Sequence, residues 1–301
     1  SGGGFALMNE GLSLAGMIES PLVIHLGQRP GPATGLPTRT EQGDLLYTIF
    51  AGHGEFPRVI LPPGTIEEAF ELTRRAFLIA DRFQVPVIVL TDQYLLDSSY
   101  NLPVLEVPQG KVENEIVETE KDYRRYALTD DGISPRGIPG HGAGLVLADS
   151  DEHDQHGRIT EDFDVRVEMV DKRSRKLDGL IEETVEPEFV GDGDYRTLII
   201  GWGTTHNTIL ESLNEIDGEG IGYLHFSQVY PLSPKTEEYL EKADKTVVIE
   251  NNSTGQFARL LRMIFGHKAD ETILKYNGLP FSREEVTAAL TDLISRMKTD
   301  D

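Results

Sequence analysis

Two stretches of the chain alternate short apolar runs with longer amphipathic ones, at the spacing typical of β-α-β units. In the first stretch, apolar residues recur every three or four positions over 66–83, after Thr65 and with two glutamates in the first turn, which predicts a helix. Short apolar runs at 21–27, 58–61 and 87–90 are bounded by proline, glycine or charged residues and predict central strands. Strands that alternate with helices in this way favour a parallel sheet with covering helices.

The last third of the chain repeats this pattern. It predicts strands at 197–201, 221–226 and 246–250, and helices at 205–216, 255–265 and 282–297. The sequence therefore predicts a second α/β unit.

The region between these stretches, 101–192, has scattered proline and glycine, alternating charges and few apolar runs. It predicts a connector with some strand content. Ile159-Thr160-Glu161-Asp162 resembles an N-terminal cap, followed by a charged helix that extends to about Glu183. The apolar stripe of this helix is narrow, so we expect a long, solvated arm.

The chain opens on Ser1-Gly2-Gly3-Gly4, without an initiator Met, and continues with an apolar pattern typical of a helix. A glycine-rich turn that opens a helix usually follows a strand in a β-α-β unit. We therefore expect a further strand upstream and interpret the chain as cut from a longer polypeptide.

The composition excludes several classes of function. With 51 Asp and Glu against 28 Lys and Arg, the formal net charge is -23, so sequence-independent binding to nucleic acid is not expected. The absence of cysteine excludes disulfides, cysteine nucleophiles and iron–sulfur ligation by this chain. The longest apolar runs are far shorter than the roughly 20 residues of a membrane helix. We therefore predict a soluble, cytoplasmic protein that binds neither nucleic acid nor membrane.

The most distinctive local feature is the proline- and glycine-rich segment 28–44, which directly follows the first predicted strand. Open α/β sheets bind ligands at the carboxyl ends of their strands, so binding groups are expected here. The guanidinium of Arg29 suits a carboxylate or a phosphate, and Thr34 could add a hydroxyl. Two alternatives stay open. Arg29 and Arg39 could pair with nearby carboxylates, and Thr40 could simply cap the next helix.

Two further segments contain residues suited to chemistry. His53 lies between glycines, so its imidazole could approach a ligand, although a hydrogen-bonded loop histidine is the simpler interpretation. Segment 151–156 mixes carboxylates and imidazoles. Neighbouring residues converge on one ion only where a loop folds back sharply, so we expect a solvated or partner-facing loop and no metal site.

Five motifs together resemble the α subunit of 2-oxoacid:ferredoxin oxidoreductases, over nearly the whole chain. They are Gly3 to Met8, Gln28 to Asp44, His53 to Arg58, Asp151 to Asp154, and Glu250 to Gln256. The resemblance implies an α/β fold with three parts. A thiamine-diphosphate pyrimidine-binding domain, incomplete at its N-terminus, would cover 1–103. A connector with a long charged helix would cover 104–192, and a transketolase-C-terminal-like domain 193–301.

The resemblance also implies an activity. It is the coenzyme A-dependent oxidative decarboxylation of a 2-oxoacid, such as 2-oxoglutarate, pyruvate or 2-oxobutyrate, to acyl-CoA and carbon dioxide, with reduction of ferredoxin. Arg29 would hold the substrate carboxylate and Thr34 would lie beside it as the second catalytic residue. Asp151 and His53 would influence the choice of substrate side chain.

By the same resemblance, this chain works only within a complex. Thiamine diphosphate and Mg²⁺ would be shared with or held by a β subunit that also binds a [4Fe-4S] cluster, and no cofactor-binding residue is assigned here. The other partners would be ferredoxin and an N-terminal fragment of the same subunit, with a γ-like part and the start of the first domain. The family's Tyr-Pro-Ile-Thr-Pro segment and activating glutamate are absent from these 301 residues. The alternatives are a non-catalytic assembly subunit and a subunit of another thiamine-dependent enzyme.

Overall fold

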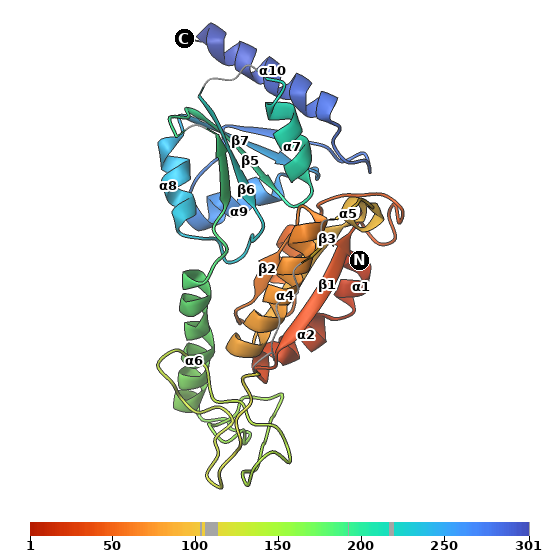
Figure 1. Cartoon of the computed structure of the whole chain (residues 1–301). Helices are drawn as coiled ribbons and strands as arrows, with labels where there is room; N and C mark the ends of the chain where they lie inside the picture. Colours follow the sequence, from red (N-terminus) through yellow and green to blue (C-terminus); the bar gives the residue numbers. More distant parts are fainter. Residues whose placement is uncertain (103, 106–113, 192, 217–219, 301) are drawn as a thin grey trace.

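The computed structural model describes residues 1–102, 104–105, 114–191, 193–216 and 220–300, which form two β-sheets and a long separate helix (Figure 1). The first sheet has the strand order β1-β3-β2, and both pairings are parallel. The elements of this first unit are α1 (Gly2–Ala6), α2 (Asn9–Met17), β1 (Leu22–Gln28), α3 (Leu45–Phe50), β2 (Val59–Leu61), α4 (Ile66–Phe83), β3 (Pro86–Asp92) and α5 (Gln93–Asp97).

The first sheet is covered on both faces, because successive side chains of a strand point to opposite sides. Val87 and Val89 of β3 pack with Leu72 and Ala76 of α4. The alternate residues of the same strand, Ile88 and Leu90, belong to a second cluster that contains Phe5 and Leu12 of α1 and α2. The central strand β3 is buried at every position as a result.

The second sheet has the order β4-β6-β5-β7-β8, in which only the edge strand β4 is antiparallel to its neighbour. Helices α8 and α9 pack on one face, and α7 and α10 pack on the other. The elements are β4 (Glu188–Gly191), β5 (Thr197–Trp202), α7 (Thr205–Leu213), β6 (Ile221–Phe226), α8 (Lys235–Lys242), β7 (Lys245–Glu250), α9 (Gln256–Phe265), β8 (Glu271–Leu274) and α10 (Arg283–Asp300).

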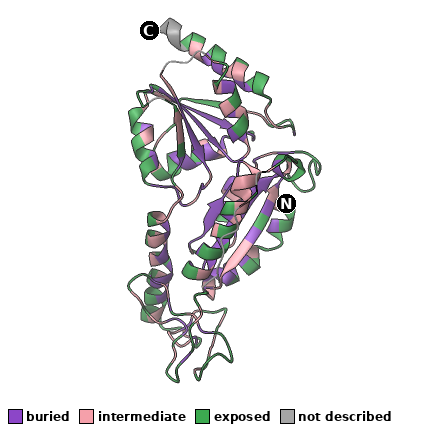
Figure 2. Ribbon diagram, in the orientation of Figure 1, coloured by how far each residue is buried: buried purple, intermediate pink, exposed green. Residues whose placement is uncertain are grey.

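A continuous apolar cluster joins the two units. It contains Leu45 and Ile49 of α3 together with Trp202 of β5 and Phe257 of α9, all of them buried. Figure 2 shows buried residues along the strands of both sheets. The second unit is thus packed directly against the loop-bearing end of the first one.

The connector between the units consists mainly of loops gathered around the amino-terminal end of α6 (Phe163–Glu182) (Figure 1). Before β4, its described part contains isolated bridges, such as that between Ile116 and Arg136, but no strand. The strand content expected for 101–192 is therefore limited to these bridges and to β4 (Glu188–Gly191), which pairs with the second sheet. The predicted cap of α6 is confirmed, because the Asp162 carboxylate accepts hydrogen bonds from the backbone N–H groups of Asp164 and Val165.

The expectation that α6 is a solvated arm is wrong. Its buried face contains Lys172, Arg173 and Lys176 alongside Met169 and Leu180. Cations are buried here because carboxylates from distant segments pair with them, a property that an apolar stripe does not reveal.

Most strands and helices lie where the hydrophobic pattern predicts them, with ends that differ by a few residues. The predicted start of α4 is confirmed, because Thr65 Oγ1 accepts a hydrogen bond from the Glu68 N–H at 3.0 Å. The helix predicted after the glycine run forms two short helices with Leu7 exposed between them. The division at 103/104 and 192/193 and the upstream strand stay predictions, and residues 103 and 192 lie outside the described ranges. No described helix has both the length and the apolar composition needed to cross a bilayer.

Candidate functional site

Arg29 lies at the carboxyl end of β1, immediately after Gln28, whose register partner Asp92 ends β3. Its side chain is half-buried, and its Nε atom is buried without a hydrogen-bond partner. Neither Arg29 nor Arg39 forms an ion pair with a carboxylate among the described residues. The alternative that both arginines pair with local acids is therefore wrong for the part of the chain that is described.

Residues 31–39 of the loop are exposed, and Thr34 is one of them. The loop turns back on itself through hydrogen bonds from the Leu36 N–H to the Pro30 carbonyl at 3.1 Å and from the Arg39 N–H to the Leu36 carbonyl at 3.1 Å. Gly35 has φ of +50°, and a Cβ added there would lie 1.8 Å from the Pro30 carbonyl oxygen. Only glycine fits this turn. The turn folds the exposed part of the loop, with Thr34, back toward Pro30, the residue after Arg29.

Gln28 closes the base of this loop. Its Oε1 accepts a hydrogen bond from the Asp44 N–H at 3.0 Å, and its Nε2 donates to the Thr91 carbonyl at 3.4 Å. Asp44 Oδ2 is buried without a partner, and burial raises the pKa of this carboxyl. The loop therefore contains two buried polar atoms without a described partner, Arg29 Nε and Asp44 Oδ2. The sequence pattern did not indicate Asp44 as a candidate site residue.

Thr40 does not cap the following helix. Its hydroxyl accepts a hydrogen bond from the Tyr94 N–H at 3.2 Å, and its backbone N–H donates to the Gly278 carbonyl at 3.1 Å. Asp44 stands at the N-cap of α3, without a side-chain hydrogen bond to the helix. The capping alternative is wrong, and Thr40 instead ties the loop to both units.

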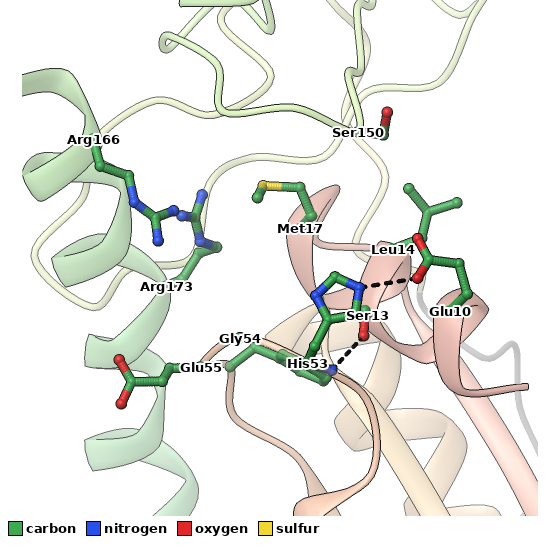
Figure 3. A pocket seen from close by; sticks show the side chains of 12 residues that line it. Glu10, Ser13, Leu14, Met17, His53, Gly54, Glu55, Ser150, Arg166 and Arg173 are labelled. Carbon is green, nitrogen blue, oxygen red and sulfur yellow. Dashed lines mark hydrogen bonds and ion pairs between the residues drawn. The ribbon is translucent and has the colours of Figure 1, made fainter. Parts of the chain in front are cut away.

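His53 lines a cavity of about 220 Å³ between α2 and α6 (Figure 3). Its Nε2 lies 2.9 Å from Glu10 Oε2, and its backbone N–H donates to Ser13 Oγ at 2.8 Å. Both the His53 and Glu10 side chains are largely exposed. Arg166 and Arg173 of α6 reach toward the cavity from the opposite side (Figure 3). His53 is a hydrogen-bonded loop histidine that also borders a cavity.

The Asp151 segment approaches the same cavity through its neighbour Ser150. Asp151 is exposed, whereas the next carboxylate, Glu152, pairs with Arg173 at 2.9 Å and with Arg166. Burial alone would raise the pKa of Glu152, but hydrogen bonds from the two guanidinium groups outweigh it and lower the pKa to about 2. These ion pairs fix the position of the segment against α6.

The remaining side chains of this segment diverge. His153 is fully buried, packs against Tyr126 in a tilted arrangement with ring centroids 4.0 Å apart, and shares a hydrogen bond between its Nδ1 and the Asp151 carbonyl at 3.0 Å. Asp154 accepts hydrogen bonds from the backbone N–H groups of His156 and Arg158. Glu152, His153 and Asp154 thus contact different groups and do not converge on one point, although His153 Nε2 is buried without a hydrogen-bond partner.

The structure brings the four candidate residues together in pairs. Arg29 and Thr34 share the loop after β1, whereas His53 and the Asp151 segment meet at the cavity beside α6, which neither Arg29 nor Thr34 lines. A magnesium-bound diphosphate requires a set of oxygen ligands. Within the described ranges, no group of three His, Asp or Glu side chains is placed to hold a metal ion. A Mg²⁺ ion that is bound to a diphosphate needs only one or two protein carboxylates, because the phosphates supply further oxygen ligands.

Residues 1–172 match the family model described as "Pyruvate flavodoxin/ferredoxin oxidoreductase, thiamine diP-bdg". The chain is 40% identical over 306 residues to the α subunit of 2-oxoacid:ferredoxin oxidoreductase 2 of Aeropyrum pernix, covering 98% of this chain and 47% of that protein. It is 31% identical over 258 residues to the 2-oxoglutarate synthase subunit KorA of Archaeoglobus fulgidus, covering 84% of this chain and 67% of that subunit.

Among solved structures, the chain is similar to a 2-oxoglutarate:ferredoxin oxidoreductase from Magnetococcus marinus with 2-oxoglutarate, coenzyme A and succinyl-CoA bound. The TM-score is 0.86 at 28% identity, and the match covers 96% of this chain and 51% of that one. The chain thus spans about half the length of several of the proteins it matches.

Proposed function

Because the chain belongs to the pyruvate flavodoxin/ferredoxin oxidoreductase family, we propose that it forms the substrate-binding part of the α subunit of a 2-oxoacid:ferredoxin oxidoreductase. The reaction is the coenzyme A-dependent conversion of a 2-oxoacid to acyl-CoA and carbon dioxide, with electrons passed to ferredoxin. The relatives whose names state such an activity, and the neighbour with 2-oxoglutarate and coenzyme A bound, support this proposal.

The observation that carries the proposal is the state of Arg29. The chain has 51 acidic side chains against 28 Lys and Arg, yet this half-buried guanidinium pairs with no described carboxylate, and its Nε has no hydrogen-bond partner. An arginine of this kind suits the carboxylate of a 2-oxoacid, because its planar group donates two parallel hydrogen bonds. The exposed Thr34 hydroxyl lies on the same loop and would donate a further one.

Within this reaction, the chain's own task is orientation. Fixing the carboxylate at Arg29 fixes the direction of the neighbouring carbonyl carbon, which is where bond breaking occurs. We assign thiamine diphosphate, Mg²⁺ and a [4Fe-4S] cluster to a β subunit, with coenzyme A and ferredoxin as further reactants. We propose no role for the described side chains of this chain in binding those groups.

We assign the choice of substrate side chain to His53 and Asp151. Support comes from the cavity that His53 and Ser150 line, where two arginines of α6, both paired with Glu152, reach toward His53 (Figure 3). Because Arg29 does not line this cavity, these residues would act at a site completed by another subunit of the complex.

The Arg29→Ala variant, studied in the assembled complex, tests the proposal. We expect the KM for the 2-oxoacid to rise about 100-fold or turnover to disappear, since a charge-assisted hydrogen bond contributes about 1.5–3 kcal/mol. The assay is reduction of ferredoxin or viologen with coenzyme A and pyruvate, 2-oxobutyrate or 2-oxoglutarate. Arg39→Ala, in the exposed part of the same loop, is the matched control and should behave as wild type. Wild-type kinetics for Arg29→Ala in an intact complex would contradict the proposal and favour an assembly subunit.

A further inference from the structure

We propose that Gln42 is a positioning residue, through which the second α/β unit holds the Arg29 loop in its substrate-binding geometry. The inference rests on the function proposed above. Gln42 does not need to touch the substrate in order to act, because it fixes the end of the segment that carries Arg29 and Thr34.

Every polar group of Gln42 is bonded to the second unit. Its Nε2 donates to the Trp202 carbonyl at 2.7 Å, and its Oε1 accepts from the Asn251 N–H at 2.9 Å. Its backbone N–H donates to the Asn251 carbonyl at 2.7 Å, and its carbonyl accepts from Asn252 Nδ2 at 3.2 Å. Only 1% of Gln42 is exposed, so loss of these bonds would leave buried polar groups without partners.

The partners of Gln42 are themselves held rigidly. Trp202 ends β5 and is fully buried, and Asn251 and Asn252 directly follow β7. The buried Glu250 carboxylate accepts hydrogen bonds from Asn252 Nδ2 at 2.7 Å and from the Phe257 N–H at 2.8 Å. The carboxyl ends of two neighbouring strands therefore form a fixed platform for Gln42.

The loop is anchored on both sides of its exposed part, and Arg29 lies between these anchors. Gln28 closes its base, Thr40 and Gln42 fasten its far end, and residues 31–39 between them are exposed. Because few other contacts restrain the exposed part, its position depends on these anchors. The Gln42 contacts are neutral, so they would change where Arg29 points without changing the charge that the substrate meets.

The test is Gln42→Met in the assembled complex with the full-length subunit, a change that keeps the side-chain volume and removes both side-chain hydrogen bonds. We expect the KM for the 2-oxoacid to rise about tenfold with kcat within twofold. Hydrogen exchange at the Leu36 and Arg39 amides should accelerate at least tenfold. The matched control is Gln228→Met. Gln228 is also buried, and it bonds the Val185 N–H and the Pro231 carbonyl at 3.0 Å each.

Gln228→Met removes the same number of side-chain hydrogen bonds away from the loop, so it should lower stability but leave KM and loop exchange unchanged. If Gln42→Met behaves like this control, the positioning role is wrong. The double variant with Arg29→Ala should have the KM of Arg29→Ala alone, because Gln42 acts through Arg29. A further additive rise in KM would also overturn the inference.

Gln42→Glu provides a second variant should Gln42→Met assemble poorly. A protonated glutamic acid can donate to the Trp202 carbonyl and accept from the Asn251 N–H as glutamine does, so KM should be closer to wild type at pH 6 than at pH 8. A KM that does not fall toward acid pH contradicts the role. Failure of the proposed function gives a different result. In that case Arg29→Ala itself leaves KM at the wild-type value, whatever Gln42 does.

Discussion

Besides the apolar cluster, two polar joints of opposite chemistry help to attach the first sheet to the rest of the chain. The amide joint consists of Gln42, Asn251, Asn252 and Gln256, which connect the Arg29 loop to the second unit. The charged joint consists of Glu19, Lys172 and Lys176. It attaches α6 to the segment before β1, with Lys172 Nζ 2.7 Å and Lys176 Nζ 2.6 Å from Glu19 Oε2.

The difference shows how each joint is suited to its place. Neutral amides are directional and carry no net charge, so they can fix a loop beside an anionic substrate without competing for it. Buried charges cost desolvation, and their removal one at a time is strongly destabilising. The charged joint therefore enforces one docked position of α6, whereas the amide joint sets geometry near the candidate site.

The charged joint contains two cations for one carboxylate. Burial alone would raise the pKa of Glu19, but the ammonium groups of Lys176 and Lys172 outweigh it and lower the pKa to about 2. Burial lowers the pKa of Lys172 to about 8, despite the attraction of Glu19. The carboxylate is thus the group on which the joint depends.

The largest effect is expected for Glu19→Gln, which leaves two buried ammonium groups without a counter-charge. We expect a loss of about 3–5 kcal/mol in the free energy of unfolding at pH 7, measured by urea denaturation. The folded pKa of about 2 lies below the ordinary value of 4.5, so the contribution is complete above pH 4.5 and disappears as the pH falls toward 2.

The control for this prediction is Glu71→Gln, which removes an exposed pair with Arg74 on α4 and should leave stability nearly unchanged. A loss for Glu19→Gln as small as that of the control would contradict the description of the charged joint.

A smaller effect is expected close to the amide joint, where the rings of His206 and His225 pack in a tilted arrangement with centroids 3.9 Å apart and Glu68 of α4 faces His225. Burial, with repulsion from His225, lowers the pKa of His206 to about 4 from 6.5. The unfolded chain therefore binds more protons between these values, and stability falls on acidification, by roughly 3 kcal/mol over this range.

The measurement is the slope of unfolding free energy against pH between 6.5 and 4.5. His206→Phe keeps an aromatic ring against His225 and should flatten the slope, whereas His141→Phe, at an exposed position, should not change it. Equal slopes for His206→Phe and wild type would mean that His206 does not contribute to the pH dependence of stability.

The smallest effect is expected for the N-terminal cap of α6, which stabilises the helix itself and not its contact with the first unit. Asp162→Ala removes the cap that accepts hydrogen bonds from Asp164 and Val165, so we expect a loss of about 1 kcal/mol. Thermal or urea unfolding measures it, and Asp164→Ala, next to the cap, is the control. A loss as large as that of Glu19→Gln would show that α6 depends on its own stability more than on the charged joint.

Sequence patterns predicted those elements whose formation depends on neighbouring residues, such as helix caps and apolar periodicity. The cap at Thr65 and the periodicity after it predict α4, and the apolar run at 87–90 predicts the fully buried β3. The position of Arg29 after a strand was enough to expect a binding loop, because parallel strands present their carboxyl ends at one edge of a sheet.

The parts that could not be predicted depend on partners far away in the chain. The buried cations of α6 are explained by Glu19, which lies 153 residues before Lys172. The bond between Gln42 and Asn251 joins residues 209 positions apart. Periodicity contains no information on such pairs, so the α6 arm was wrongly expected to be solvated, and Gln42 was not recognised as functional.

The long separation between the two sides of the amide joint has a consequence for engineering and evolution. Segments 28–44 and 250–256 are joined although the connector and α6 intervene. The Gln42 side chain bonds main-chain groups of Trp202 and Asn251, so a second unit with a different sequence can hold it when the turn after β7 keeps its backbone course. Chimeras that take the second unit from a relative should therefore keep their substrate affinity only when this turn is preserved.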